Sequence, residues 1–425
     1  MSEPKPGQKP HYGGAVKAAV LSIMLLQYLQ ALTSPAAGAI LKHFEQFGYT
    51  SLDIKQIQTI PTLVMIFACM AIIPMANKLR KKTILKIAMA LIFFGGIAPG
   101  IGPDSMMFIY ACRVVFGCGY GMIYALASSF IVDLFDGPEQ KQMMGWKTAA
   151  GSIGGIIFQT VGGFLAAMYW KYAFLGFLVA LPFILLILWK CPDPSGLEEF
   201  NPAKEAGRPK AKVEKGHWFV IVLAALNVMI FSSFMINMPI VIMTEGLGTP
   251  NTIALVMNLF TVGIFLGSFT YGWTTKLLKR FDIPFTILVY GIVLVILPRF
   301  VTLPVYMICA LIFGWAFGAY NPSLVLAVSR QGSALAATAA IAFFVAGQGL
   351  GQFIQPYFML LTGVFGLNEP WGELAPWVMA GPMLIAISIC SFIWVVKITN
   401  RKFPYEGNVK AVGKADQTME SPLDS

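Results

Sequence analysis

The chain has 425 residues, of which 57% are hydrophobic and only 12% are charged, whereas about 25% of the residues of an ordinary soluble domain are charged. A chain this apolar cannot cover its own surface with polar groups, so its composition excludes a soluble globular protein and indicates a membrane protein. The net charge of +10 would suggest nucleic-acid binding in a soluble protein. Here the basic residues lie in short loops, where they indicate membrane topology, and we expect no nucleic-acid partner.

The chain begins with a polar segment, residues 1–14, which is rich in Pro, Gly and Lys. The apolar run that starts near Ala15 is too long for the core of a signal peptide and has no small-residue cleavage site, so we expect it to remain as a first membrane helix. Further spans of roughly 20 residues, the length that crosses a bilayer, follow it. About twelve are predicted, at 16–40, 56–76, 84–101, 106–133, 143–168, 172–190, 218–243, 251–275, 283–298, 303–329, 334–363 and 374–397.

A stretch rich in Pro, Glu and Lys, residues 191–216, separates six spans from six. It divides the chain into an N-terminal six-helix bundle at 15–190 and a C-terminal six-helix bundle at 217–400, followed by a polar tail at 401–425. Because six is even, both halves enter the membrane in the same direction, as in a parallel repeat. The predicted fold class is therefore an all-α integral membrane protein with two pseudo-symmetric bundles.

Lys and Arg are concentrated in the loops at one end of the predicted bundle. They follow the second span, the sixth span, the eighth span and the twelfth span, and include Lys78, Lys81, Lys82, Lys276, Lys279 and Arg280. Loops enriched in Lys and Arg stay in the cytoplasm. We therefore expect both termini to be cytoplasmic and the protein to lie in the cytoplasmic (inner) membrane.

Glycines recur between the two halves at a fixed offset of 197 residues. In the first half they fall on a stripe of small residues at every fourth position, which is one face of a helix. Such a stripe lets a neighbouring helix approach closely. The glycines predicted to pack helices in this way are Gly117, Gly121 and Gly154 in the first half and Gly314, Gly318 and Gly351 in the second.

The same four-residue ladder carries a cation, Arg113, inside the fourth span. A cation at membrane depth costs at least about 2.5 kcal/mol unless it is paired or hydrated. Arg113 is therefore predicted to bind an anionic substrate or to take part in proton coupling. The alternative is an arginine that snorkels to the outer interface. Ala310 stands at the equivalent position of the second half, so this charge is not repeated.

Polar side chains line single faces of several predicted helices. An amide that faces lipid is costly, so these faces should point into the bundle and line a cavity. Hydrogen bonds between helices would satisfy the same requirement without any substrate. The predicted cavity-lining residues are Gln27, Gln30, Tyr120, Tyr124, Ser233, Asn237, Tyr320, Asn321, Gln348 and Gln352.

Three segments carry a family resemblance. They are RVVFGCGYG at 113–121, DLFDGPEQKQMMG at 133–145 and WKYAF at 170–174, and with them the chain resembles a major facilitator superfamily transporter from about residue 15 to 400. The resemblance implies a twelve-helix transporter and links Arg113 to proton transfer. Two signatures depart from the family pattern. The loop after the second span reads IPMANKLRKK, and Phe158-Gln159 stand where antiporters carry Gly-Pro.

The resemblance also implies a charge network at the cytoplasmic end of the fourth span. Asp133 would pair there with the basic loop, through Lys78, Lys81 or Lys82, and form a latch that holds one access state. The alternative is an ordinary interfacial charge. The repeat-equivalent residue of Asp133 is Arg330, so any latch of this kind is asymmetric.

Several activities are disfavoured by what the sequence lacks. It contains neither a GxxxxGK[ST] phosphate-binding loop nor an HExxH zinc motif, and its three histidines lie outside the spans. Its six cysteines form no CxxC pair. Apart from Asp133 at a helix end, no Asp or Glu lies inside a predicted span, which disfavours a cation carrier. We expect no enzyme activity, no cofactor and no metal.

These observations predict a secondary transporter that moves a small organic solute, anionic or neutral, by alternating access, with a proton as a candidate coupling ion. We expect it to function as a monomer in the lipid bilayer. A multidrug/proton antiporter-like exporter is the first alternative. A transporter-like receptor or sensor is the second, although the central loop and tail are short for a signalling domain.

Overall fold

The computed structural model describes residues 12–76, 79–194, 215–329, 334–358 and 360–399. The predicted N-terminal segment, central loop and tail therefore lie almost entirely outside the described residues. Within these ranges every regular element is a helix. The prediction of an all-helical, multi-span membrane fold is confirmed.

The first half consists of six spans, the first and last of which are interrupted. The first span comprises α1 (Gly14–Leu26), the 3-10 helix η1 (Leu29–Thr33) and α2 (Ala37–Phe44), and is followed by η2 (Glu45–Phe47). Four continuous helices follow, and the sixth span is divided into three pieces. These elements are α3 (Ser51–Ala76), α4 (Lys81–Ile101), α5 (Met106–Leu134), α6 (Gly137–Met168), α7 (Tyr172–Leu175), η3 (Gly176–Ala180) and α8 (Leu181–Lys190).

The second half repeats this succession of long helices. Its elements are α10 (Lys215–Thr244), α11 (Pro250–Leu278), η5 (Lys279–Phe281), α12 (Asp282–Ile296), α13 (Leu303–Ser329), α14 (Ala334–Phe358), α15 (Leu360–Val364), α16 (Asn368–Trp371), η6 (Gly372–Leu374) and α17 (Ala375–Thr399).

Eight helices within the described residues are long and apolar enough to cross a membrane, and three shorter apolar helices accompany them. The shorter ones belong to the predicted first, seventh and ninth spans. The largest error in a predicted boundary is at α6, which begins at Gly137 and not near residue 143. The prediction followed the apolar run, whereas the helix begins with a polar turn around Pro138, a residue that is well suited to the first turn of a helix.

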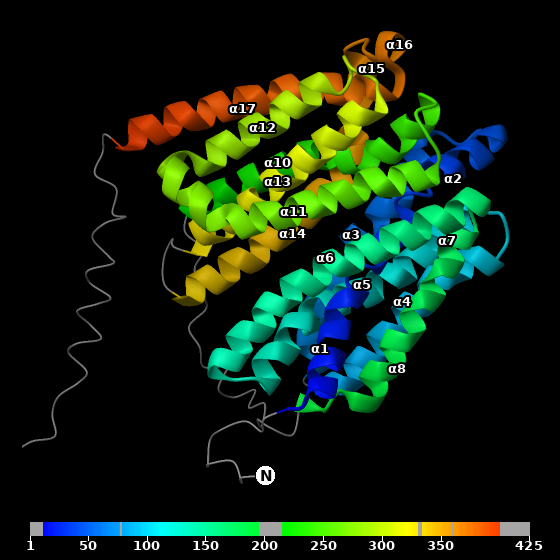
Figure 1. Cartoon of the computed structure of the whole chain (residues 1–425), viewed down its shortest axis with the longest axis vertical. Coiled ribbons are helices and arrows are strands. Elements are labelled where there is room, and N and C mark those ends of the chain that lie inside the picture. The colour runs from blue at the N-terminus through cyan, green and yellow to red at the C-terminus, as the bar shows by residue number, and fades with distance from the viewer. Residues whose placement is uncertain (1–11, 77–78, 195–214, 330–333, 359, 400–425) are drawn as a thin grey trace, which may run out of the picture.

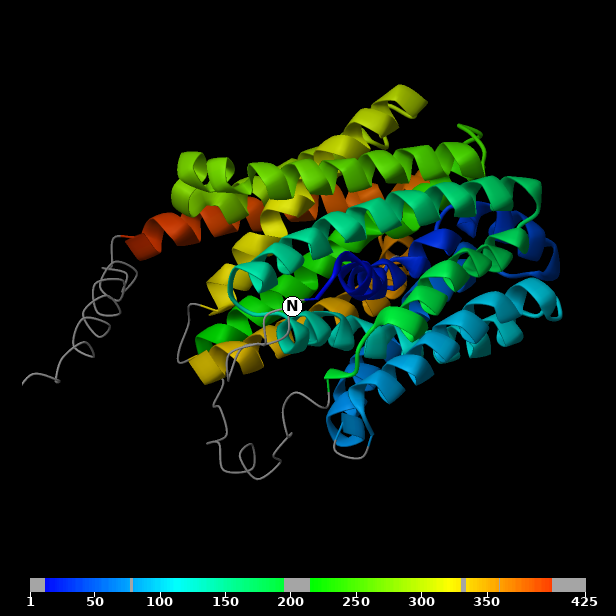
Figure 2. The ribbon, with the colours of Figure 1, turned by 60° about the horizontal axis from the view of Figure 1, so that its bottom comes forward.

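Each half packs around its own apolar core. In the first half α5 packs against both α3 and α4, and in the second half α13 packs in the same way against α11 and α12. Figure 1 and Figure 2 show the two bundles side by side, the first from blue to green and the second from green to red. The loops that follow odd-numbered spans gather at one end, called the loop end below. The first helix begins and the last described helix, α17, ends at the opposite end, called the terminus end.

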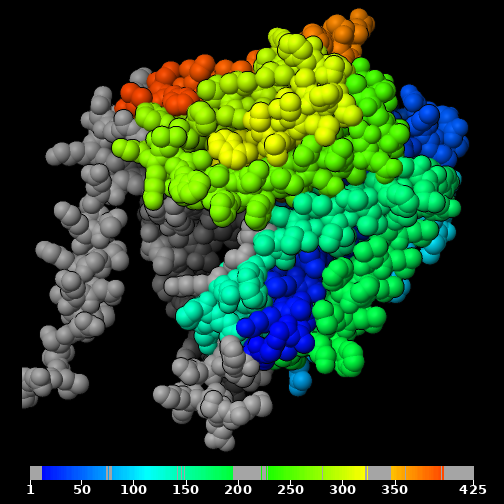
Figure 3. Space-filling view, in the orientation of Figure 1, coloured from blue at the N-terminus to red at the C-terminus, as the bar shows by residue number. Residues whose placement is uncertain are grey.

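The two halves contact each other mainly through α6 with α11, α3 with α14 and α2 with α10. Near the loop end α6 and α11 run side by side, and they separate towards the terminus end (Figure 1). The space-filling view shows the surfaces of these two helices diverging in the same direction (Figure 3). The arrangement is a wedge that is closed at the loop end.

Candidate functional site

The glycine ladders pack the central helices of each half. A Cβ added at Gly117 would lie 2.8 Å from Val64 Cβ, and one added at Gly121 would lie 2.6 Å from the backbone oxygen of Met65. Both neighbours are on α3. Close approach of α5 to α3 therefore requires these glycines, because real Cβ atoms do not come this near to other atoms.

The other glycines of the predicted set lie at comparable helix contacts. Gly314 and Gly318 of α13 face backbone atoms of Phe260 and Ile264 on α11, so the first-half arrangement recurs in the second. Gly154 of α6 lies against Leu25 of α1. Gly351 is buried in α14.

Arg113 is enclosed in the interior of the first half. Its side chain is 0% exposed. Its guanidinium carbon lies 5.3, 4.9 and 5.9 Å from the ring centres of Phe116, Phe174 and Phe177. None of its three guanidinium nitrogens has a hydrogen-bond partner within the described part of the chain. Aromatic faces attract cations, so these rings stabilise the enclosed charge.

Further along the same face of α5, an aromatic ladder leads towards the space between the halves. Tyr120 stacks on Phe116 with ring centres 5.9 Å apart, and Tyr124 follows at 6.4 Å from Tyr120. Gln27 donates a hydrogen bond of 3.2 Å to the backbone oxygen of Tyr124. The first span is interrupted at Gln27 and Tyr28, so α1 ends beside this ladder.

Two tyrosines remain accessible there although they lie near the middle of their spans. Tyr28 is 41% exposed and Tyr124 is 40% exposed. Tyr28 also lies against Gly151 of α6, where an added Cβ would come within 2.5 Å of its ring. A Cβ added at Gly155 of the same helix would lie 3.6 Å from Tyr28 and 3.4 Å from Thr261 of α11, so Tyr28 lies close to the interface between the halves.

The remaining residues predicted to line a cavity are placed in several environments. Gln30 donates a hydrogen bond of 2.7 Å to the backbone oxygen of Gln58, which links the first span to the second. In the second half Ser233, Asn237 and Tyr320 are enclosed in the bundle interior in this conformation. Gln348 and Gln352 are half-buried on α14, and the side chain of Asn321 lies outside the described residues.

The predicted latch residues Lys81 and Asp133 are brought together. Lys81 Nζ lies 2.7 Å from Asp133 Oδ2 and 3.3 Å from Ser129 Oγ, and Ser129 donates a hydrogen bond of 3.0 Å to the same carboxylate. The pair ties the start of α4 to the last turn of α5 at the terminus end. Lys78 and Arg330, the other two predicted gating residues, lie outside the described residues.

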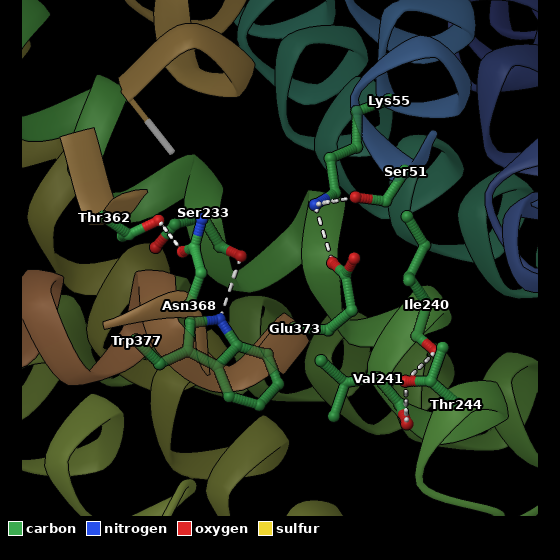
Figure 4. Close-up of polar contacts among 10 residues, drawn as sticks. All are labelled: Ser51, Lys55, Ser233, Ile240, Val241, Thr244, Thr362, Asn368, Glu373 and Trp377. Carbon is green, nitrogen blue, oxygen red and sulfur yellow. Dashed lines mark hydrogen bonds and ion pairs between the residues drawn. The ribbon is translucent and has the colours of Figure 1, made fainter. Parts of the chain in front are cut away.

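Sequence reasoning missed an ion pair that joins the halves at the loop end. Lys55 of α3 lies 2.9 Å from Glu373 of η6 and 3.3 Å from Ser51 Oγ (Figure 4). The Lys55 side chain is only 3% exposed. The sequence shows Lys55 only as a basic residue near a loop, and nothing in the local pattern identifies a partner 318 residues away.

Three hydrogen bonds between described residues join the halves from the loop end to mid-span. Gln56 donates to Tyr357, Asn258 to Thr160, and Thr261 to Gln159, at distances of 3.4, 2.7 and 3.3 Å. Together with the Lys55–Glu373 pair, they place the polar links of this part of the interface in the half of the bundle nearest the loops.

A second basic residue that sequence reasoning missed is Lys147 of α6. Its ammonium donates a hydrogen bond to Ser128 of α5. The sequence places Lys147 only a few residues into a predicted span that starts near residue 143, where a lysine usually reaches the interface. The actual start of α6 at Gly137 puts Lys147 almost three turns into the helix.

No group of three or more His, Cys, Asp or Glu side chains that could hold a metal ion occurs in the part of the chain that the structure describes.

Comparisons with known proteins agree with this architecture. The family model described as Major Facilitator Superfamily matches residues 19–240, which is more than half of the chain. No curated protein sequence matches the chain.

Solved structures match over most of their length. The inward-open xylose transporter XylE from E. coli is 17% identical, with a TM-score of 0.66, over 88% of this chain and 94% of that chain. A POT family transporter in complex with 5-aminolevulinic acid is 13% identical, with a TM-score of 0.69, over 92% and 98%. A bacterial homologue of the human lysosomal transporter Spinster is 16% identical, with a TM-score of 0.60, over 91% and 96%. At these identities the likeness establishes the fold alone.

Proposed function

Because the chain belongs to the major facilitator superfamily, whose members are membrane transporters and not enzymes, we propose that it moves a small organic solute, anionic or neutral, by alternating access. The family establishes a multi-pass membrane protein and a secondary transporter. The solute class, the coupling proton and the direction of transport belong to the proposal.

The observation that carries the proposal is the wedge between the halves. Tyr28 and Tyr124 are accessible near mid-span, and the loop end is closed by the Lys55–Glu373 pair. A central position that is reached from one end only is what one state of an alternating-access carrier requires. Opening the loop end and closing the terminus end would generate the other state.

The orientation follows from the basic loops. Lys81 and Lys82 lie at the terminus end, and loops enriched in Lys and Arg stay in the cytoplasm. The wedge therefore opens to the cytoplasm, and the Lys55–Glu373 pair closes the external end. We place the protein in the cytoplasmic membrane, with both termini inside, and expect a monomer to be sufficient.

The charges of the wedge support an anionic or neutral solute. At the terminus end the carboxylate of Asp133 is already paired with Lys81, whereas Arg113 has no carboxylate partner within the described residues. Three of the matching transporters carry or hold a sugar, a peptide-like compound and 5-aminolevulinic acid, according to their descriptions.

The test is substitution of Arg113. Arg113→Ala should reduce solute uptake into proteoliposomes to background, because the charge that couples or holds the solute is lost. The protein should still fold, since Ala310 occupies the equivalent buried position of the second half at 0% exposure. Uptake would be measured with labelled organic acids and sugars, and folding by gel-filtration profile in detergent.

The matched control is Arg299→Ala. Arg299 follows α12 at the loop end, and among the described residues its side chain bonds its own helix, through the backbone oxygen of Val295 at 2.7 Å. This variant should transport normally. Normal uptake kinetics in Arg113→Ala would overturn the role assigned to Arg113.

A further inference from the structure

We propose that Lys147, held by Ser128, is the anion-binding group of the solute site, and that Tyr28 and Tyr124 flank it. The group would take the carboxylate of a small organic anion. This inference rests on the proposed transport function and adds to it a named contact and a charge class.

The helix geometry brings these residues together. Lys147 and Gly151 are four residues apart on α6, and Ser128 and Tyr124 are four residues apart on α5. Residues at this spacing share a helix face and are separated by about 6 Å along the axis. Gly151 contacts Tyr28, and Lys147 donates to Ser128. The lysine therefore lies about one turn from the accessible tyrosines, on the side of the terminus end.

The half-buried lysines at this end have different kinds of partner, and Lys82 donates a hydrogen bond of 2.6 Å to the backbone oxygen of Cys191. Lys17 pairs with Glu139 and Lys81 pairs with Asp133. Among the described residues, the one polar partner of Lys147 is a neutral hydroxyl. A partly buried ammonium without a carboxylate attracts an anion or water, because a lone charge is costly to remove from solvent.

Arg113 is a poorer candidate for direct contact in this state. It is fully enclosed beneath three aromatic rings, whereas the Lys147 side chain is half-buried and lies next to accessible rings. The ring faces of Tyr28 and Tyr124 provide an apolar surface for the body of the solute. An organic anion with one carboxylate and a flat or apolar body fits this combination.

The charge also has no counterpart in the second half. The residue 197 positions after Lys147 is Phe344. Like the charge of Arg113, the charge of Lys147 is therefore found in the first half and is not repeated at the equivalent position of the second half. This is the pattern expected of a residue that serves the solute and not the packing of the repeat.

The experiment is calorimetric titration of the purified full-length protein with benzoate and with its neutral isostere benzamide. Lys147→Gln should weaken benzoate binding at least about tenfold, the effect expected when a charge-assisted hydrogen bond is lost. Lys147→Arg should retain most of the affinity, because the charge is kept. Benzamide binding should change little in any variant. Lys86→Gln is the matched control, because Lys86 is an exposed lysine on a span of the same half.

Three outcomes would overturn the assignment. One is unchanged benzoate affinity in Lys147→Gln. Another is an equal loss of benzoate and benzamide binding, which would indicate a structural role. The third is failure of benzoate, acetate and pyruvate to bind the wild-type protein.

Uptake of the same anions into proteoliposomes separates this inference from the proposed function. Binding that depends on Lys147, without uptake by the wild-type protein, would overturn the transport proposal and keep the site. Wild-type uptake that is unaffected in Lys147→Gln would keep transport and overturn the site.

Discussion

The two halves share a helix-packing scaffold but differ in where they carry charge. Gly117 and Gly121 allow α5 to pack closely on α3. Gly314 and Gly318 allow α13 to pack on α11 in the same way. The charged residues are not repeated. The positions of Arg113, Lys55 and Lys147 are occupied in the second half by Ala310, Thr252 and Phe344.

The aromatic residues show how each half adapts to this difference. In the first half, Phe116 lies beneath the Arg113 guanidinium. Its repeat equivalent, Phe313, instead stacks on Phe234 with ring centres 4.2 Å apart, and also contacts Phe231 at 5.0 Å. The half without the cation thus closes its core with ring-on-ring contacts. Duplication preserved the helix packing, while the chemistry of the core diverged.

The terminus ends of the halves differ in a similar way. In the first half the start of α4 supplies a cation, Lys81, and α5 supplies the acid, Asp133. In the second half the start of α12 supplies the acid, Asp282, which accepts a hydrogen bond of 2.7 Å from Ser323 of α13. Each arrangement joins the third span of its half to the fourth. Between described residues, only the one in the first half is an ion pair.

The largest effect is expected when Lys55 is replaced by the residue of the other half. Lys55→Thr removes one partner of a buried ion pair, which costs about 3–5 kcal/mol, and should shift the protein towards a state that is open at the loop end. Spin labels on Phe47→Cys and Glu369→Cys, both exposed near the loop end, would report the change as a longer distance.

Two further variants make this prediction decisive. Lys42→Gln, at an exposed lysine of the same end, should leave the distance unchanged. Exchanging the charges as Lys55→Glu with Glu373→Lys should restore much of the closed population. An unaltered distance distribution in Lys55→Thr would show that the pair does not close the loop end.

The next effect concerns the glycines that pack the central helices. We expect α13 to pack more tightly on α11 than α5 packs on α3. A Cβ at Gly314 would lie only 2.0 Å from the backbone oxygen of Phe260, whereas the closest atom to a Cβ at Gly117 would be Val64 Cβ at 2.8 Å, so the backbone would have to move less at Gly117. Overpacking costs about 1–3 kcal/mol. Gly314→Ala should therefore lower the melting temperature more than Gly117→Ala.

Gly272→Ala is the control for this comparison, because an added Cβ there has no atom within 4 Å. It should leave the melting temperature in detergent nearly unchanged. Equal losses for Gly117→Ala and Gly314→Ala would contradict the inferred difference between the ladders.

The smallest effect is expected at the terminus end. Asp133→Asn breaks a pair whose side chains are 31% and 19% exposed, and partly exposed pairs contribute at most about 1 kcal/mol. A double-mutant cycle with Lys81→Gln would measure the coupling, and uptake should fall only a few-fold. Coupling of zero would reduce the proposed latch to an ordinary interfacial charge.

The sequence predicted features that depend on local pattern. The membrane spans, the glycine packing faces and the cation within the fourth span follow from hydropathy, four-residue spacing and the cost of burying charge. The meeting of Lys81 with Asp133 was expected from the family resemblance and is seen at 2.7 Å. Their gating role stays a prediction.

Other features depend on contacts that local pattern does not encode. Glu373 lies in η6, 318 residues along the chain from Lys55. Several predicted cavity residues bond to backbone oxygens, as Gln27 does to Tyr124. Lys147 was missed because the helix begins before the apolar run does. Tertiary packing decided each of these cases.

The interruption of the first span lets one membrane crossing contact both halves. The inner piece, α1, packs on α5, α6 and α8 of its own half. The outer piece, α2, is buried with Trp170 and Phe174 of the first half and also lies against α10 of the second, with Gly38 next to Pro239. An unbroken helix would resist bending along its whole length. With the segment from Gln27 to Ala36 as a joint, a change in the angle between the halves would be absorbed by a few peptide units, beside the two accessible tyrosines.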